Sequence, residues 1–390
     1  MAHVFQPFDL ERIMSRWENV VEYNLSESGV HPVTLAELAA YDSTLVQRML
    51  EIELGYGVAN GSLALREAIA QWYPGTTPDN VLVTVGCAEA NFLVFTTLLQ
   101  AGDSVAIQVP NYLQGWGLAH NLGAVRMTFR LDPDRGWALD EEQLRQAVTD
   151  ATKLVAVCNP NNPTGHIMTL AEMDAVVRVA ERRGAWLLTD EVYAGAERET
   201  DTFTPTFYGR YDRVLAAGSL SKAYGLPGLR IGWVVGPVEM IDQLWARHEY
   251  LSISTAKLSN HLLAPIALSR QVRPALLDRT RQYIRRGWSV FEAWADEHAD
   301  VVSVVPPQAA AIAFPRYHLA IDSITLTDRL IHDASVLVAP GDHFGIPHHL
   351  RVSYGLEHAY LREGLNRIAA VLRRTAEEKG TASKVADAAI

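Results

Sequence analysis

The sequence has few of the features that mark secreted, membrane-spanning or nucleic-acid-binding proteins. Only two cysteines occur among 390 residues, Cys87 and Cys158, which excludes a disulfide framework and favours a reducing, cytoplasmic location. The first residues lack a signal-peptide core, and no apolar run of about 18 residues predicts a membrane span. A formal net charge of −11 argues against nucleic acid or an anionic membrane as the main partner. Small-molecule chemistry is the expectation.

The order of apolar segments predicts the fold class. Hydrophobic residues make up 48% of the chain, enough for one large domain and a smaller one. Short runs rich in Val, Leu, Ile and Ala alternate with helix-length segments, which predicts an α/β fold with a mainly parallel sheet covered by helices on both faces. Strands are expected at residues 81–85, 104–109, 154–158, 186–189, 214–217 and 231–235.

The chain divides into four expected parts. The large domain is placed at residues 46–285, and a long helix at 273–298 leaves its sheet. A smaller α+β domain follows at 286–376, joined by an N-terminal arm at 1–45 that also forms part of it. The polar and small residues of 377–390 predict a loose tail.

One loop carries a reactive amine beside candidate phosphate-binding groups. The stretch SLSKAYGLPGLR, residues 219–230, follows a predicted buried strand, so Lys222 and Ser221 lie where open α/β sheets bind ligands. Lysine condenses with an aldehyde to form a Schiff base, and partial desolvation lowers its pKa. Ser219 and Arg230 can hold a phosphate. A solvated lysine on a polar loop is the alternative reading of this motif alone.

Three further loops follow strand ends on the same predicted rim. Cys87 and Ala88 open a helix whose free N–H groups can bind a phosphate, unless the segment is an ordinary tight turn. Tyr112 can lie over a planar ligand, or be a core tyrosine. In residues 159–165, prolines fix a turn from which an asparagine amide can point at the ligand.

Two charged residues complete the candidate site. Asp190 ends a buried strand, where a carboxylate is costly unless paired, and a protonated ring nitrogen is such a partner. A helix N-cap is its alternative role. Arg351 lies in a strand-like run and can grip a carboxylate through two hydrogen bonds, although a surface ion pair is the alternative. No metal site is expected.

Together these features call for a phosphorylated planar aldehyde with a basic ring nitrogen and for an amino-acid substrate, which is the chemistry of pyridoxal phosphate. Across roughly residues 50–355, the ordered motifs NPNNPTG, TDEVY and SLSKAYGLPGLRIG resemble those of fold type I pyridoxal-phosphate enzymes, in the class I/II aminotransferase family. The resemblance implies a role for each residue. Lys222 is the covalent cofactor lysine and general acid/base, Asp190 pairs with the ring nitrogen, Asn162 and Tyr193 hydrogen-bond the ring oxygen, and Tyr112 stacks on the ring. The phosphate is held by Ser219, Arg230 and the amides of Cys87 and Ala88, Ser221 is a further cofactor-binding residue, and Arg351 binds the substrate carboxylate.

The resemblance also implies a homodimer with shared active sites. Tyr56 matches the tyrosine that such dimers lend to the phosphate site of the partner subunit. Residues 307–310, Pro-Gln-Ala-Ala, depart from the family pattern, because many relatives have paired glycines there beside the substrate.

The sequence says less about the substrate side chain than about the cofactor. No second arginine for a distal carboxylate is evident, and Glu27, near Gly29, can face a cationic substrate side chain unless it is a solvated arm carboxylate. The histidines that precede the candidate arginine either line the pocket or lie on a surface loop; they are His343, His348 and His349.

The motifs predict removal of an α-proton but do not specify the chemical step after it. Transamination is the leading interpretation. Elimination or replacement at a side-chain carbon, as in enzymes similar to aminocyclopropane-carboxylate synthase or in cyclases similar to capreomycidine synthase, is the alternative. A regulatory protein of the same fold is a third reading, but such regulators carry an N-terminal DNA-binding domain for which this chain has no room.

Overall fold

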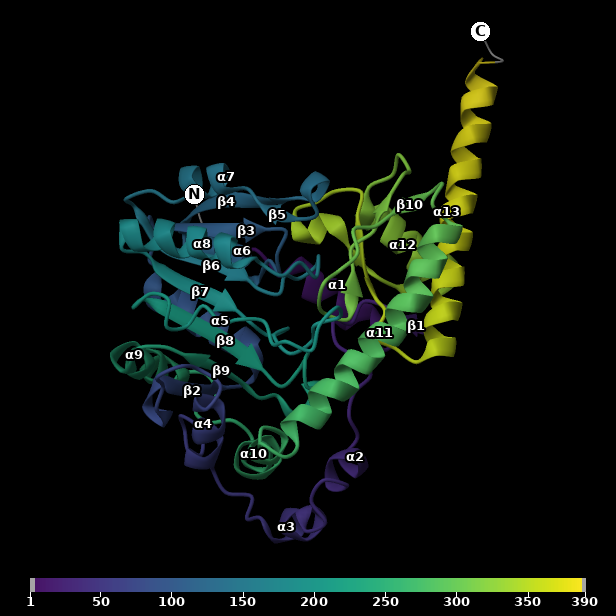
Figure 1. Cartoon of the computed structure of the whole chain (residues 1–390). Coiled ribbons are helices and arrows are strands. Elements are labelled where there is room, and N and C mark those ends of the chain that lie inside the picture. Colours follow the sequence, from purple (N-terminus) through teal and green to yellow (C-terminus); the bar gives the residue numbers. More distant parts are fainter. Residues whose placement is uncertain (1–3, 388–390) are drawn as a thin grey trace.

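The computed structural model describes residues 4–387, and the side chains of residues 4–378. A large lobe built on one broad sheet lies beside a smaller lobe, and the long helix α11 (Arg273–Glu297) extends between them (Figure 1). No helix in this part of the chain is long and apolar enough to cross a membrane.

The central sheet has eight strands in the order β2-β9-β8-β7-β6-β3-β4-β5. Neighbouring strands from β8 to β4 run parallel, whereas β9 and β5 run antiparallel to their neighbours. Strands β3 and β8 are buried at every residue, as expected where helices cover both faces. The predicted α/β class is confirmed. The strands are β2 (Val81–Thr84), β3 (Ser104–Val109), β4 (Val125–Asp132), β5 (Ala138–Leu139), β6 (Thr152–Cys158), β7 (Trp186–Asp190), β8 (Val214–Ser219) and β9 (Gly232–Val235).

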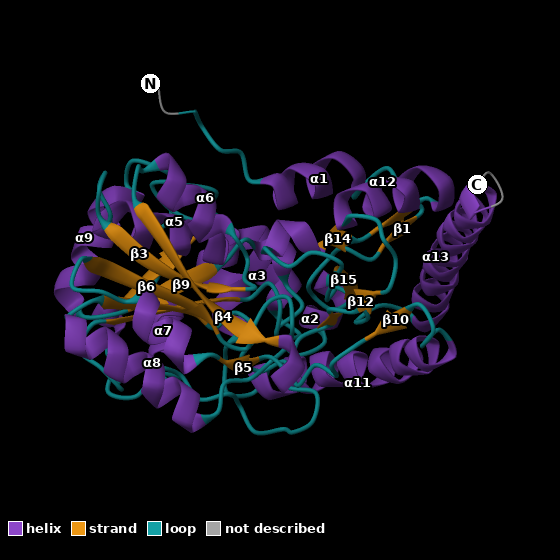
Figure 2. Cartoon of the chain, turned by 90° about the horizontal axis from the view of Figure 1, so that it is seen from above, coloured by secondary structure: helices purple, strands orange, loops and turns teal. Residues whose placement is uncertain are grey.

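Helices cover the two faces of this sheet (Figure 2). Helices α5, α6 and α9 share one apolar core with the strands, and α7 and α8 share another. Helix α8 begins with a capping box between Thr169 and Glu172 and ends at Gly184 in the left-handed conformation, as such a sequence predicts. The helices of the large lobe are α4 (Leu63–Ala70), α5 (Gly86–Leu98), α6 (Gln114–Asn121), α7 (Glu141–Ala147), α8 (Leu170–Arg183), α9 (Val238–His248) and α10 (Ala264–Ala267).

The N-terminal segment packs with the small lobe. Strand β1 (Tyr23–Asn24) pairs in parallel with β13 (Val336–Leu337). Two segments, α2 (Leu35–Ala39) and α3 (Leu45–Glu51), then lead to the large lobe. The remaining elements are α1 (Asp9–Trp17), β10 (Val302–Ser303), β11 (Ile312–Ala313), β12 (Arg316–Tyr317), α12 (Ser323–Ala334), β14 (Ala339–Pro340), β15 (Leu350–Ser353) and α13 (His358–Asp387).

Two features differ from the sequence-based expectation. Strand β4 was not predicted, because it lies near the sheet edge and alternates exposed and buried residues, so it lacks a continuous apolar run. A loose tail was expected from residue 377, whereas α13 continues as a helix to Asp387. The residues of that stretch include Glu, Lys and Ala, which have high intrinsic helix propensity.

Gly287 allows α11 to approach the backbone of the small lobe. A Cβ atom added at this position would lie 1.7 Å from the carbonyl oxygen of Tyr354. Because that oxygen belongs to the backbone, Gly287→Ala must displace the helix, and we expect it to lower the free energy of unfolding by about 3 kcal/mol. Denaturant titration measures this. As a control, Gly117→Ala in α6 meets no heavy atom within 4 Å and should be neutral or mildly stabilising. Equal losses in both variants would contradict the explanation.

Candidate active site

A cavity of about 460 Å³ opens at the carboxyl edge of the sheet. Its walls come from the large lobe, the small lobe and the N-terminal segment. It brings together all the residues predicted for the site except Gly29 and Tyr56. The predicted residues that line it are Glu27, Cys87, Ala88, Tyr112, Asn162, Asp190, Tyr193, Ser219, Ser221, Lys222, Arg230 and Arg351.

Lys222 lies on the loop that follows β8. Burial lowers the pKa of its ammonium group, the carboxylate of Glu27 opposes that shift, and the nearby Arg351 adds to it. Gly29 lies against this residue, since a Cβ atom added there would be 3.8 Å from Lys222 Cδ and 3.5 Å from the Ser221 carbonyl oxygen. A lysine of lowered pKa is more often the free amine, which can attack an aldehyde or accept a proton.

Asp190 ends β7, the strand next to β8. Burial raises the pKa of its carboxyl group, and hydrogen bonds oppose that shift. Oδ1 accepts from the backbone N–H of Val192 at 3.1 Å, and Oδ2 accepts from the side-chain amide of Asn91 at 3.3 Å. This partly buried carboxylate has no ion-pair partner among the described residues, so a protonated ring nitrogen of a cofactor fits it.

Sequence reasoning missed Asn91. It follows Cys87 by about one turn of α5, so both side chains reach the same end of the cavity. That helical spacing after the predicted phosphate turn is the signal that points to Asn91. Gln114 lies nearby, donating to the Ala88 carbonyl oxygen at 2.8 Å.

The part of the cavity around the N-terminus of α5 is suited to an anion. The N-terminus of α5 begins at Gly86, which has a φ of +77° and lies against Arg230. A Cβ atom at Gly86 would be 2.4 Å from Arg230 Nη2, so the close approach of the guanidinium requires glycine here. Ser219 lies beside this turn and accepts a hydrogen bond from the Ser221 N–H at 3.1 Å. Free helix N–H groups and a guanidinium together favour a phosphate.

Arg351 joins the cavity from β15 and is only 2% exposed. Its Nη1 donates to Asn162 Oδ1 at 3.1 Å, and its Nη2 donates to the Ser26 carbonyl oxygen at 2.5 Å. The Nε atom is buried without a hydrogen-bond partner among the described residues. Burial raises the pKa of the nearby Tyr193 phenol, which keeps it a neutral donor. A buried guanidinium with a free N–H is suited to a substrate carboxylate.

The N-terminal segment forms an acidic wall of the cavity. Glu11 and Glu18 line it together with the predicted Glu27. Burial raises the pKa of Glu18, and the charges of Glu27 and Glu11 raise it further. The Tyr112 hydroxyl donates to Glu11 Oε1 at 2.7 Å, and its ring packs edge-on against Phe8 at 4.9 Å between centroids. Sequence reasoning missed the contribution of α1, where acidic residues seven apart recur on one helical face.

Several other candidates lie outside this cavity. Tyr56 is 86% exposed and does not line it. His343 lines a separate cavity, and neither His348 nor His349 reaches the candidate site. His349 stacks on Phe314 instead, with ring centroids 4.8 Å apart. The suggestion that these histidines line the pocket is therefore wrong.

Residues 307–310 tie the two lobes together rather than line the cavity. The backbone N–H groups of Gln308 and Ala309 both donate to the Gly165 carbonyl oxygen at 3.0 Å. Gln308 also accepts from the Ile167 N–H at 2.9 Å through its side chain. This segment is thus attached to the turn that carries Asn162.

Comparison with known proteins gives the family. The family model for aminotransferases of class I and II matches residues 32–368. Capreomycidine synthase of Streptomyces vinaceus is 32% identical, covering 92% of this chain and 90% of that protein. An aspartate/prephenate aminotransferase of Thermus thermophilus is 29% identical, covering 82% and 83%. A solved pyridoxal-phosphate-dependent aminotransferase of Streptococcus suis superposes with a TM-score of 0.88 at 30% identity, covering 95% and 98%. The chain belongs to the class I and II aminotransferase family of fold type I, and its cofactor is pyridoxal 5′-phosphate.

Proposed function

We propose that this enzyme is an aminotransferase that acts on an α-amino acid with a cationic side chain. The observation that carries the proposal is the placement of Lys222, with its lowered pKa, beside Asp190 at one edge of the sheet, in a cavity with an acidic wall. The amine and the carboxylate suit the aldehyde and the ring nitrogen of the cofactor.

Each predicted site residue has a proposed role toward the cofactor. Bound pyridoxal phosphate supplies an electron sink for the pair left at the α-carbon. Lys222 holds the cofactor covalently and then, as a free amine, takes the α-proton and returns it. Asp190 stabilises the protonated ring nitrogen. The remaining proposed cofactor contacts are Asn162 and Tyr193 with the ring oxygen, Tyr112 with the ring face, and Ser219, Ser221, Arg230, Cys87 and Ala88 with the phosphate.

The substrate is proposed to lie between Arg351 and the acidic wall. Arg351 binds the α-carboxylate, while Gly29 leaves room beside the lysine side chain. Among the described residues, the only lysine and arginines lining the cavity are those assigned to the cofactor and the α-carboxylate. Glu11, Glu18 and Glu27 therefore face the substrate side chain without a distal cation, which favours a positively charged side chain.

A cyclase or lyase is the second candidate. The specific observation in its favour is the 32% identity to capreomycidine synthase over nearly the whole of both chains. In that case the same lysine removes the α-proton, and a group on the side chain is then expelled or replaced.

A cytoplasmic homodimer is also proposed. Large apolar side chains are exposed around the segment that carries Tyr56, among them Leu50 at 79% and Leu54 at 86%, and Tyr250 is 93% exposed. Exposed apolar residues gathered in one region are typical of an interface. In such a dimer, Tyr56 would reach the phosphate site of the partner subunit, as the family resemblance implies. Both cysteines are free thiols, which suits a reducing compartment.

Gly86→Ala is expected to weaken binding of pyridoxal phosphate by about tenfold or more, because the new methyl group displaces the guanidinium of Arg230. Titration of cofactor-free protein, followed by absorbance, measures the affinity. Gly75→Ala is the matched control: Gly75 has a similar positive φ of +70°, but a Cβ there meets no heavy atom within 4 Å. If both variants bind the cofactor equally well, Arg230 does not hold the phosphate.

The reaction type can be read from the visible absorbance of the bound cofactor. In transamination the amino group is retained until a keto acid collects it, so ornithine given without a keto acid should remove the absorbance in one turnover. Adding a keto acid should restore it. Stopped-flow spectroscopy measures both steps, and Lys222→Ala should show neither. If the absorbance persists through many turnovers with no need for a keto acid, the aminotransferase assignment is wrong and the enzyme is a cyclase or lyase.

Glu18→Gln combined with Glu27→Gln should lower selectivity for ornithine over its uncharged analogue norvaline. We expect the ratio of the two kcat/KM values to fall about tenfold or more, since two carboxylates facing the side chain are lost. The control is Glu22→Gln, because Glu22 lies outside the cavity and pairs with Arg367 at 2.7 Å. Unchanged selectivity in the double variant would remove the cationic substrate and leave the cofactor assignment intact.

A further inference from the structure

A second cavity, of about 240 Å³, lies next to the active site. Ser219 and Val192 line both cavities, so the two share a wall. Arg273, the first residue of α11, lines the second cavity and is not used by the chemistry described above.

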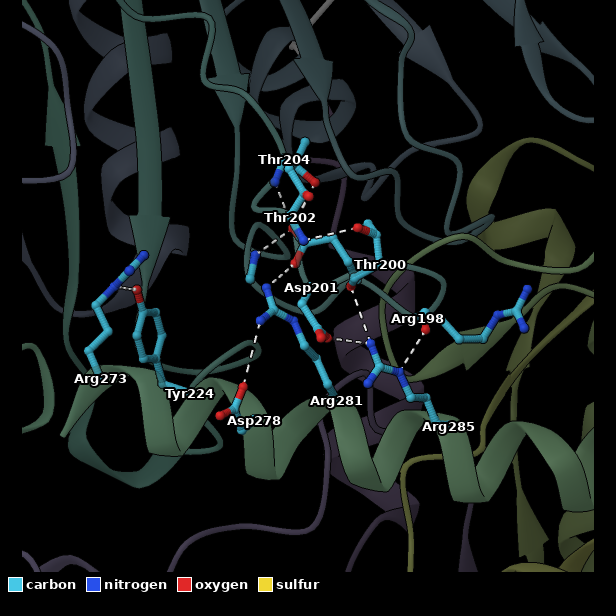
Figure 3. Close-up of polar contacts among 12 residues, drawn as sticks. Arg198, Thr200, Asp201, Thr202, Thr204, Tyr224, Arg273, Asp278, Arg281 and Arg285 are labelled. Carbon is cyan, nitrogen blue, oxygen red and sulfur yellow. Dashed lines mark hydrogen bonds and ion pairs between the residues drawn. The ribbon is translucent and has the colours of Figure 1, made fainter. Parts of the chain in front are cut away.

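The guanidinium of Arg273 is enclosed by aromatic rings. The residue is 6% exposed, and its Cζ atom lies 3.6 Å from the centroid of the Trp72 ring and 4.7 Å from that of Phe203. Its Nε donates to the Tyr224 hydroxyl at 2.9 Å, the single contact drawn for it in Figure 3. Within the described residues, Nη1 and Nη2 have no hydrogen bond or ion pair.

Two other arginines of the same helix have carboxylate partners. Arg281 pairs with the buried Glu197 at 2.7 Å. Arg285 pairs with Asp201 at 2.5 Å, as Figure 3 shows. Among these three, Arg273 alone has no carboxylate partner in the described part of the chain. The missing partner is therefore a property of one position and not of the helix.

Aromatic rings cannot accept the hydrogen bonds that an anion would accept from a guanidinium. They lie against its flat faces and attract its charge, but its N–H groups point outward in the plane and need acceptors. A buried charge without an opposite charge is costly. The in-plane edge of Arg273 therefore has N–H donors that can bind an acceptor in the cavity.

Hydroxyl groups in the same cavity add donors. Tyr73 accepts a hydrogen bond from Trp233 Nε1 at 3.0 Å, and Tyr224 accepts from Arg273, so the proton of each phenol is left to donate. The cavity also contains the carboxyl group of Glu191, which would repel an anion. Burial raises its pKa to about 7, and its Oε1 accepts from the Phe207 N–H at 2.9 Å, so much of its charge is neutralised or already engaged.

We propose that this second cavity binds a compact monovalent anion, a halide or a small carboxylate, held by the Nη groups of Arg273 and the hydroxyls of Tyr73 and Tyr224. Binding there is distinct from the cofactor phosphate subsite. Because the sites share a wall and both ligands are negative, each weakens binding of the other, as linkage between two sites requires.

Trp72 provides the readout for this site. Iodide is a compact anion that quenches indole fluorescence, so iodide held by Arg273 should quench Trp72 in a saturable manner. We expect the cofactor-loaded wild-type enzyme to show a saturable component at constant ionic strength, and acetate to displace it. Trp72→Phe should reduce this component to the contribution of Trp233, which also lines the cavity, whereas Arg273→Gln should lose it and retain only linear, collisional quenching.

Arg285→Gln is the matched control, since it removes a guanidinium from the same helix that already has a carboxylate partner. It should retain the saturable quenching. Linear quenching of the wild type, or saturable quenching unaffected by acetate, would overturn the proposal without recourse to any variant. Saturable quenching that survives in Arg273→Gln would also overturn it. None of these measurements depends on turnover, so they remain decisive if the aminotransferase assignment fails.

Discussion

The guanidinium of Arg351 is the point at which three separate parts of the chain meet. It comes from β15 in the small lobe, reaches Asn162 in a turn of the large lobe, and donates to the Ser26 carbonyl oxygen in the N-terminal segment. A buried cation must have its donors satisfied, so these contacts constrain all three parts at once. The shape of the cavity depends on this constraint, because each part supplies one wall.

The large sheet sets the chemistry by placing unlike charges at adjacent strand ends. Asp190 and Lys222 follow neighbouring parallel strands, and parallel strands deliver their carboxyl ends to one edge. Burial then shifts the two pKa values toward the neutral forms, raising that of the carboxyl group and lowering that of the amine. Both groups are consequently held ready for a partner that restores or uses their charge.

The sequence predicted where the residues proposed to bind the cofactor lie, but not where most of the residues proposed to face the substrate side chain lie. Lys222 and Asp190 could be predicted because each follows a continuous apolar run whose end fixes its position on the sheet. Glu11 and Glu18 could not, because they follow no predicted strand and the approach of α1 to Tyr112 is a contact between residues about a hundred apart. Strand β4 was not predicted for a related reason. Its half-exposed residues have the pattern of a polar segment, and only its place near the sheet edge explains that pattern.

The acidic wall has a consequence for how this enzyme can change over evolutionary time. Glu11, Glu18 and Glu27 all lie within the first 27 residues, whereas the residues that line the cavity and are proposed to bind the cofactor begin at Cys87. On the proposed assignment, the part of the gene that encodes the residues facing the substrate side chain is short, contiguous and separate from the part that encodes the proposed reactive groups. Recombination within that short 5′ stretch would change the substrate side chain that is accepted in one event. It would leave Lys222, Asp190 and the residues proposed to hold the phosphate unchanged.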